Sequence, residues 1–382
     1  MKLQRNGRTK ALAIGAVALV SSLSLAACGS DNNSNTNGGN SSSSASGGAS
    51  PAAAIACASK QAPFLGAGST AQGTAIDQWK TLYGAACSGS TLSYNGVGSG
   101  AGIQQFNQGK VTFAGSDSAL KPAEVDASKA VCPGGQGIDL PMVAGLVSII
   151  YNVDGVPNLV LDGPTIAKIF DSQITKWNDP AIATLNPGAN LPAADIQAFH
   201  RSDDSGTTQN LTTYLSKAGG GAWKYPAAKT WAGQGGQSAA QSSGVASQVK
   251  AVKNSIGYAE LSYAQTNNLK SAQIATGASK PVEATAANAA TTIGNAQIVG
   301  TGSDLALSLD YATKADGAYP IVLVTYEIVC DKGNKADTLD TLKSFLTYTV
   351  SDAGQAAIGD KGYVPLPKAV ADKVKAVIPT LA

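Results

Sequence analysis

The stretches VAGLVSIIY (residues 143–151) and IVLVTYEIVC (residues 321–330) are the longest apolar strand candidates in this chain of 382 residues. They divide the chain into an early part, a middle part and a short C-terminal part. Two strands that cross between two lobes form a hinge. We therefore predict that one lobe combines residues 55–142 with residues 320–382, and that residues 143–319 form the other.

Shorter apolar runs alternate with helix-like segments along the rest of the chain. Further strands are expected at residues 91–95 and 111–115, and helices at residues 71–83, 164–170, 209–217 and 339–349. Alternation of this kind indicates an α/β fold. More than one hydrophobic core is expected for a chain of this length, which agrees with two lobes. The Gly- and Ser-rich stretch from Gly219 to Gly244 is interpreted as a surface loop.

The N-terminus has the order of an export signal. Basic residues precede an uncharged, mostly apolar stretch over residues 11–27, so residues 1–27 are predicted to be a signal peptide. A permanent membrane span is the alternative, but the stretch is at the short limit for one. LAACG (residues 25–29) resembles the lipobox of bacterial lipoproteins, which predicts a lipid on Cys28 and an anchor at the outer face of the cell membrane. Residues 28–54, rich in Asn, Ser and Gly, are then a flexible tether.

The cysteines that follow the tether are even in number. Two disulfides are expected in an exported chain, and buried free thiols are the alternative. The candidates are Cys57, Cys87, Cys132 and Cys330. Sequence permits three pairings. If Cys57 and Cys87 each precede neighbouring parallel strands they can meet, which would leave Cys132 to pair with Cys330.

The charges are balanced and scattered. The 27 basic and 25 acidic residues nearly cancel, and no basic stripe marks a surface for nucleic acid. The partner is therefore expected to be small.

Three segments share a design of strand, Gly/Ser/Thr turn and helix. They are GAGST (from Gly66), GVGSGAG (from Gly96) and DSGTT (from Asp204). The first N–H groups of a helix lack partners within it and its dipole is positive there, so such turns bind anions. A single turn of this kind is more simply a helix cap. Three in one chain favour an anion site.

Two charged residues sharpen this prediction. Arg201 directly precedes the third turn and offers a planar, bidentate grip on an oxyanion. Asp117 follows the strand-like KVTFAGS (from Lys110). A carboxylate is compatible with an anion site only if the anion has a proton to donate. Phosphate has such a proton near neutral pH, whereas sulfate does not. The alternatives are a helix N-cap for Asp117 and a surface ion pair with Asp203 or Asp204 for Arg201.

Enzyme motifs are missing from the sequence. It contains no G-x-S-x-G elbow, Walker A loop, H-E-x-x-H or C-x-x-C pair, and GVGSGAG lacks the dinucleotide spacing. His200 is the only histidine and is interpreted as structural, because its side chain on a strand points away from that of Arg201. The four tryptophans are interpreted as packing residues. We expect no enzymatic activity, no cofactor and no metal.

These segments together resemble PstS, the phosphate-binding component of bacterial phosphate ABC transporters, and especially its actinobacterial lipoprotein members. The agreement covers nearly the whole mature chain. Beyond the three turns it includes FAGSD (from Phe113), LDGPTIAKIF (from Leu161), ITKWNDPAI (from Ile174), LNPG (from Leu185), HRSDDSGTT (from His200), SIGY (from Ser255) and YPIVLVTYEIVC (from Tyr319). The resemblance implies a type II periplasmic-binding-protein fold, dehydrated phosphate held between the lobes, and docking of a monomeric closed form on permease subunits.

The resemblance also implies roles for individual residues. Asp117 would accept the phosphate proton, and Asp203 would orient Arg201. The other implied phosphate ligands are Thr70, Ala71 through its backbone, Ser99, Arg201, Ser205, Gly206 and Thr207. The family often has Phe at the position of Ala71 and Gly at that of Asp204. Asp204 adds a negative charge beside the site unless its side chain points outward.

Three other functions compete with phosphate binding. A receptor for sulfate or molybdate is one, and Asp117 discriminates against it because those ligands offer no proton. A surface hydrolase of phosphate esters is a second, which the missing nucleophile and metal ligands disfavour. A purely adhesive surface antigen is a third, for which an anion site would have no purpose.

Overall fold

The computed structural model describes residues 55–382. The predicted signal peptide, Cys28 and the tether to residue 54 lie outside the described residues. Within residues 55–382, none of the helices combines the length and the apolar character needed to cross a bilayer.

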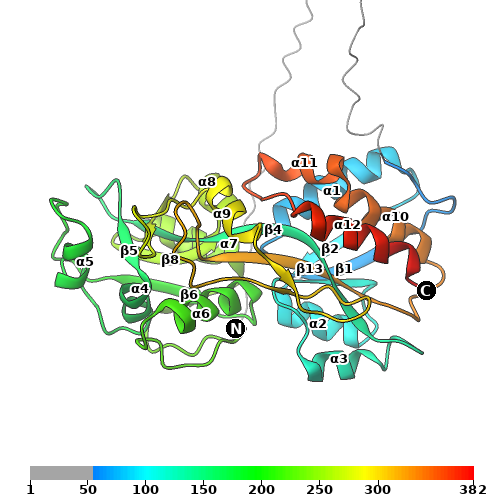
Figure 1. The fold of residues 1–382 in the computed structure, drawn as a ribbon, viewed down its shortest axis with the longest axis horizontal. Coiled ribbons are helices and arrows are strands. Elements are labelled where there is room, and N and C mark those ends of the chain that lie inside the picture. Colours follow the sequence, from blue (N-terminus) through cyan, green and yellow to red (C-terminus); the bar gives the residue numbers. More distant parts are fainter. Residues whose placement is uncertain (1–54) are drawn as a thin grey trace, which may run out of the picture. The chain divides into compact units, whose positions relative to one another are not determined.

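A nine-stranded mixed sheet runs through the described chain (Figure 1). Its strand order is β2-β1-β3-β13-β4-β8-β6-β7, and β9 pairs with β4. These strands are β1 (Phe64–Gly68), β2 (Leu92–Gly96), β3 (Phe113–Ser116), β4 (Gly137–Asn152), β6 (Gln197–Arg201), β7 (Gln237–Ala239), β8 (Ser255–Glu260), β9 (Lys270–Ser271) and β13 (Val322–Cys330). Two small sheets pair β5 (Val160–Asp162) with β10 (Gln273–Ala275), and β11 (Gln297–Ile298) with β12 (Leu307–Ser308).

Helices separate most of these strands in the chain. They are α1 (Gly73–Ala86), α2 (Ser99–Asn107), α3 (Pro122–Ser128), α4 (Gly163–Phe170), α5 (Pro180–Leu185), α6 (Gly206–Ala218), α7 (Gln241–Ala251), α8 (Leu261–Thr266), α9 (Ala286–Ile293), α10 (Leu339–Val350), α11 (Asp352–Gly359) and α12 (Lys368–Val377), followed by a short 3-10 turn over Ile378–Thr380. The predicted α/β alternation is confirmed.

Strands β4 and β13 join two α/β lobes, as in a type II periplasmic-binding-protein fold. Residues 137–146 of β4 pair antiparallel with β13, and residues 147–152 pair with β8 instead. Strand β4 is buried along almost its whole length, which explains the continuous apolar run in its sequence. The lobe boundary predicted between residues 142 and 143 falls inside β4, and the lobe limits remain a prediction.

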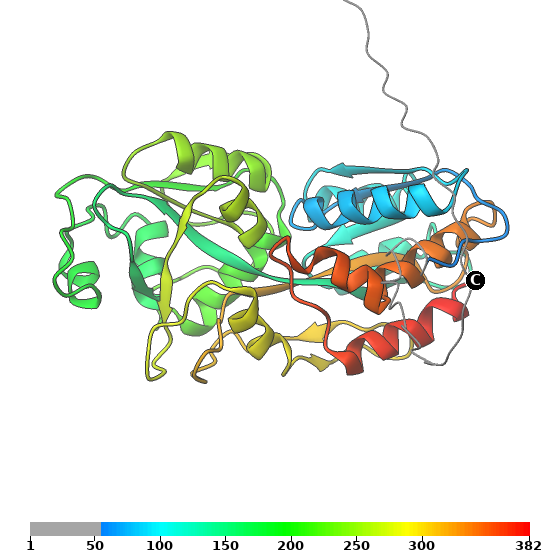
Figure 2. The ribbon, with the colours of Figure 1, turned by 90° about the horizontal axis from the view of Figure 1, so that it is seen from above.

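Within residues 55–382, the first and last segments lie side by side, with α10 and α11 next to α1 (Figures 1 and 2). Phe64 of β1 packs edge-on against Phe345 of α10, with ring centroids 5.4 Å apart. Aromatic pairs of this kind contribute about 1 kcal/mol beyond the burial of their area. The C-terminal segment therefore completes the core around β1.

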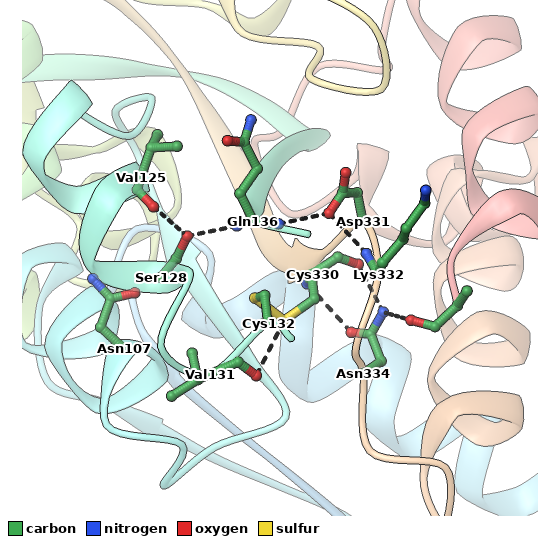
Figure 3. Close-up of a disulfide and its surroundings, with 12 residues drawn as sticks. Asn107, Val125, Ser128, Val131, Cys132, Gln136, Cys330, Asp331, Lys332 and Asn334 are labelled. Atoms are coloured by element: carbon green, nitrogen blue, oxygen red, sulfur yellow. Dashed lines mark hydrogen bonds between the residues drawn. A yellow bond between two sulfur atoms is a disulfide. The ribbon is translucent and has the colours of Figure 1, made fainter. Parts of the chain in front are cut away.

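Both expected disulfides are present. Cys57 is bonded to Cys87 and Cys132 to Cys330, each with Cα atoms 5.4 Å apart. Cys57 precedes β1 and Cys87 precedes β2, and these strands pair in parallel. The second disulfide ties the segment after α3 to the end of β13 (Figure 3), where Asp331 also accepts a hydrogen bond from the backbone N–H of Gln136 at 2.7 Å.

The interpretation of residues 219–244 as a surface loop was wrong in its last part. Strand β7 occupies Gln237–Ala239 and α7 starts at Gln241. The small, polar composition of this stretch hid both elements, because only a few of its side chains pack into the core. The tryptophans are packing residues as predicted: Trp79, Trp177 and Trp223 are buried and Trp231 is partly buried.

Candidate functional site

The three Gly/Ser/Thr turns each connect a strand to a helix, as predicted. The first lies between β1 and α1, the second between β2 and α2, and the third between β6 and α6. Ser205 caps α6, since its hydroxyl oxygen accepts a hydrogen bond from the N–H of Thr208 at 3.2 Å. Gly98 precedes α2 with a φ of 92°, a conformation that favours glycine.

The turns from the two lobes meet directly. The backbone N–H of Gly206 donates to Ser99 Oγ at 3.1 Å, and that of Gly100 donates to the Asp204 carbonyl at 2.9 Å. A Cβ at Gly206 would lie 2.6 Å from both Ser99 Oγ and Asp117 Cβ, so only glycine allows this approach. The N-termini of α2 and α6 therefore face one another across the interface between the lobes.

Asp117 lies at the centre of this meeting point, directly after β3, and its side chain is buried. Its Oδ1 accepts hydrogen bonds from Ser69 and from Thr325 Oγ1 at 2.7 Å, and its Oδ2 accepts one from Ser99 Oγ at 3.3 Å. Asp117 does not cap a helix, because α3 begins only at Pro122.

The environment of Asp117 favours its protonated form. Burial and the neighbouring Glu260 raise the pKa of Asp117 to about 6. The hydrogen bonds from Ser69 and Thr325 and the charge of Arg201 act in the opposite direction and lower it. A carboxyl group with a pKa close to neutrality can exchange a proton with a bound anion in the physiological range.

Arg201 ends β6 and is buried, with its guanidinium group held by Asp203. Nε donates to Asp203 Oδ1 at 2.8 Å, and Nη2 donates to Oδ2. Burial alone would lower the pKa of Arg201, but the Asp203 carboxylate raises it above its usual value. Burial likewise opposes ionisation of Asp203, yet the bonds and charge of Arg201 hold the pKa of that carboxyl below its usual value. Asp203 therefore orients a permanently charged Arg201.

Thr70 and Ala71 lie in the first turn, and both are buried. Thr70 Oγ1 and Ser242 Oγ are 2.9 Å apart, which brings the first turn to the start of α7. The N–H of Ala71 donates to Ser69 Oγ at 3.0 Å. Thr207 in the third turn lies beside Arg201, with Nη1 3.4 Å from Thr207 Oγ1. The structure thus brings the residues predicted to bind phosphate to one place.

Two other residues lie near the site. Asp204 is exposed, its carboxylate accepts a hydrogen bond from Thr230 Oγ1 at 2.6 Å, and its side chain lies against Gly100 of the second turn, where an added Cβ would be 2.5 Å from Asp204 Cβ and 3.3 Å from Asp204 Oδ2. His200 stacks on Trp231 with ring centroids 4.8 Å apart, and its Nδ1 lies 3.0 Å from the Arg201 carbonyl. Burial lowers the pKa of His200. Its structural interpretation agrees with these contacts.

Several residues of the site were not predicted from the sequence. Ser242 accepts a hydrogen bond from Arg201 Nη1 at 3.0 Å, and Thr325 reaches Asp117 from a register shift in β13. Glu260 accepts a hydrogen bond from Thr207 Oγ1 at 2.6 Å. Ser69 belongs to the GAGST turn and Thr325 to the YPIVLVTYEIVC segment, but nothing in these segments assigns the two side chains to the site. Ser242 and Glu260 lie outside the segments that carry the resemblance.

The whole chain is similar to phosphate-binding proteins of mycobacteria. "Phosphate-binding protein PstS 3" of Mycobacterium tuberculosis is 40% identical over 385 residues, which covers 100% of both chains. The chain belongs to the PstS family. "Phosphate-binding protein PstS 2" of the same species is 42% identical over 81% of this chain and 85% of its own length. A family model described as "PBP superfamily domain" matches residues 38–353.

Solved structures support the same fold. A periplasmic phosphate-binding protein, PfluDING, solved with phosphate bound, superimposes with a TM-score of 0.68 over 82% of this chain and 93% of its own, at 23% identity. A putative phosphate ABC transporter substrate-binding protein from Clostridium perfringens, also with bound phosphate, has a TM-score of 0.59 at 17% identity. At these identities the likeness concerns the fold, which is that of the PstS family.

Proposed function

We propose that this PstS-family protein is an extracytoplasmic receptor that captures inorganic phosphate between its two lobes and delivers it to an ABC transporter permease. The observation that carries the proposal is the meeting of three helix N-terminal turns, from both lobes, around Asp117 and Arg201. Such turns supply N–H and O–H donors for an oxyanion, and the guanidinium group supplies the positive charge.

The positions of these groups support the phosphate ligands that we propose. From one lobe, Thr70, Ser99 and the N–H of Ala71 bind phosphate oxygens. From the other, Arg201 and the third turn (Ser205, Gly206 and Thr207) complete the cage. Ser205 Oγ accepts from the N–H of Thr208 and donates to no group within residues 55–382, so its hydrogen can be donated to the ligand. Dehydrated phosphate is then held entirely by hydrogen bonds from the protein.

Asp117 accepts the proton of the bound phosphate and so selects against sulfate. Its carboxyl group is buried among hydroxyl donors, and an anion without a proton meets an uncompensated like charge there. The raised pKa of Asp117, about 6, allows the proton to be shared between the carboxyl group and the ligand near neutral pH.

Closure of the lobes is the signal to the transporter. A ligand that contacts both lobes stabilises the arrangement in which they meet. We propose that the closed form docks as a monomer on the permease subunits and that the protein performs no chemistry. Export by the signal peptide and a lipid on Cys28 place it at the outer face of the cell membrane, with residues 28–54 as tether.

The proposal is tested by calorimetric titration of the fragment from Ala54 to Ala382, stripped of phosphate, with phosphate and then with sulfate at neutral pH. Tight binding of phosphate and no signal with sulfate are expected. Folded, ligand-free protein that binds neither anion would refute the receptor function. Equal binding of both anions would refute the role of Asp117 and favour a receptor for another oxyanion.

A further inference from the structure

Asn210 of α6 has a buried side-chain amide whose nitrogen and oxygen both have hydrogen-bond partners. The residue is 4% exposed. Nδ2 donates to the Asp117 carbonyl at 2.6 Å and to the Gly206 carbonyl at 2.8 Å. Oδ1 accepts a hydrogen bond from the hydroxyl group of Tyr311. A buried amide group with all of these partners is held in one orientation.

The chemistry of the neighbours decides which end of the Asn210 amide faces which group. The carbonyl oxygens of Asp117 and Gly206 can only accept hydrogen bonds, so the amide nitrogen has to face them. The amide oxygen then faces Tyr311, whose hydroxyl group has to donate. Burial raises the pKa of Tyr311 further above its ordinary value, so the hydroxyl group keeps the proton that it donates. Tyr311 therefore holds the amide in the orientation in which its nitrogen reaches Asp117.

The two bonds that Nδ2 donates differ in what they connect. The bond to Gly206 lies within one turn of α6, whereas the bond to Asp117 joins residues 93 positions apart and connects α6 to the end of β3 in the other lobe. The backbone N–H of Asp117 donates to Ser99 Oγ at 3.2 Å. Asp117 is thus held by Ser99 through its N–H and by Asn210 through its carbonyl. A separation of the lobes that moves α6 away from β3 breaks the second of these bonds.

Tyr311 reaches Asn210 from the connection between β12 and β13. The start of this connection is fixed to β13, because the N–H of Leu307 donates to Tyr326 Oη at 3.0 Å. Asp117, Asn210 and Tyr311 line a common cavity of about 180 Å³. The end of β3, helix α6 and the connection to β13 therefore meet at one point beside the proposed anion site.

We propose, on the basis of the phosphate-binding function above, that Asn210 is a positioning residue that fastens the two lobes to each other at Asp117, and that Tyr311 orients its amide group. Neither residue is among the proposed phosphate ligands, so both act on the ligand through Asp117 and the closed arrangement of the lobes. A bond that forms when the lobes close slows the release of phosphate and has little influence on the first encounter.

The test is stopped-flow association and dissociation of phosphate with the unaltered protein, Asn210→Leu, Tyr311→Phe and the double variant. Leucine keeps the branched shape of asparagine without its N–H donors, and phenylalanine removes only the hydroxyl group of the tyrosine. We expect phosphate to dissociate about tenfold faster from Asn210→Leu and about fivefold faster from Tyr311→Phe, with association rates nearly unchanged. The double variant should resemble Asn210→Leu, because Tyr311 acts through Asn210.

Tyr225→Phe is the matched control. The hydroxyl group of Tyr225 donates to Asp171 Oδ1 at 2.9 Å, and both residues belong to the stretch predicted to form one lobe. Phosphate should dissociate from this variant at the unaltered rate. A rate increased as much as in Tyr311→Phe would overturn the proposal, because it would show that any lost tyrosine hydroxyl weakens binding.

Urea denaturation of the ligand-free proteins separates positioning from simple support of the fold. If Asn210→Leu lowers the free energy of unfolding but leaves phosphate dissociation unchanged, Asn210 only supports α6 and the proposal is wrong. Additive effects in the double variant would overturn the role of Tyr311. All of these results leave the receptor function intact, whereas an unaltered protein that binds no phosphate would overturn the receptor function and this inference together.

Tyr311→Phe decides the matter by itself in case Asn210→Leu does not fold, since it removes a single oxygen atom. Dissociation of phosphate that is faster than from Tyr225→Phe supports the proposal. Equal dissociation rates in the two variants would overturn it.

Discussion

Replacing Lys229 with methionine removes the one ion pair that joins the two lobes among residues 55–382. Lys229 Nζ lies 2.7 Å from Glu124 Oε1, with the two side chains 6% and 25% exposed. Glu124 is held in place because its other oxygen accepts from the N–H of Lys121 at 2.8 Å, at the start of α3. The carbonyl of Lys229 accepts from the N–H of Ser205 at 3.0 Å. The pair therefore connects α3 of one lobe to the third turn of the other.

The free-energy cost of removing this ion pair depends on how deeply the pair is buried. Exposed ion pairs are worth about 0–1 kcal/mol, and breaking a fully buried pair costs about 3–5 kcal/mol. With one partner buried and the other a quarter exposed, we expect a cost of about 1.5 kcal/mol. If the pair is lost when the lobes separate, the whole cost falls on the closed form, and phosphate affinity should fall about tenfold.

The assay combines calorimetric affinity with stopped-flow dissociation of phosphate from the unaltered protein, Lys229→Met, Glu124→Gln and the double variant. The loss should appear as faster dissociation, and the second substitution should add little to the first. Lys176→Met is the matched control, since its 2.8 Å pair with Asp195 is exposed and lies within one lobe. Additive losses in the double variant, or an equal loss in the control, would refute the closing role of the pair.

Three further predictions concern the site and the disulfide that ends β13. Because burial raises the pKa of Asp117 from 3.8 to about 6, the folded protein holds this proton more tightly than the unfolded chain. The free energy of unfolding of the unaltered protein should therefore fall as the pH rises from about 4 to 7, and this fall should exceed that of Asp117→Asn by up to about 3 kcal/mol. Urea denaturation of both proteins over this pH range measures the difference. Parallel pH profiles for the two proteins would contradict the prediction. Arg201→Lys loses the two-pronged bond to Asp203 and should weaken phosphate binding about 100-fold in calorimetry, whereas an unchanged affinity would show that Arg201 does not contact the ligand. Cys132→Ser opens a disulfide that spans 198 residues and should cost about 2–5 kcal/mol in urea denaturation, with phosphate affinity of the folded protein unchanged.

The sequence alone predicted the α/β class, the two long apolar strands and the three anion-binding turns. Each of these is encoded in contiguous residues. The turns were recognisable because a strand end, a Gly/Ser/Thr turn and a helix start follow one another directly, and the burial of β4 on both faces leaves a continuous apolar run. Asp117 and Arg201 were singled out by their charge and by their positions after a strand and beside the third turn, and the family resemblance then assigned them roles.

Only the tertiary structure decided which distant residues complete the site. Thr325 donates to Asp117 across 208 positions of the chain, and Glu124 pairs with Lys229 across 105. Glu260 follows the SIGY segment closely, but the sequence does not show that its carboxyl group is buried beside the site. The burial of Asp117 and Glu260 depends on how the two lobes pack against each other. The raised pKa of Asp117 depends on this packing as well. Local sequence determines a turn, whereas burial and charge at a site depend on the folding of the whole chain.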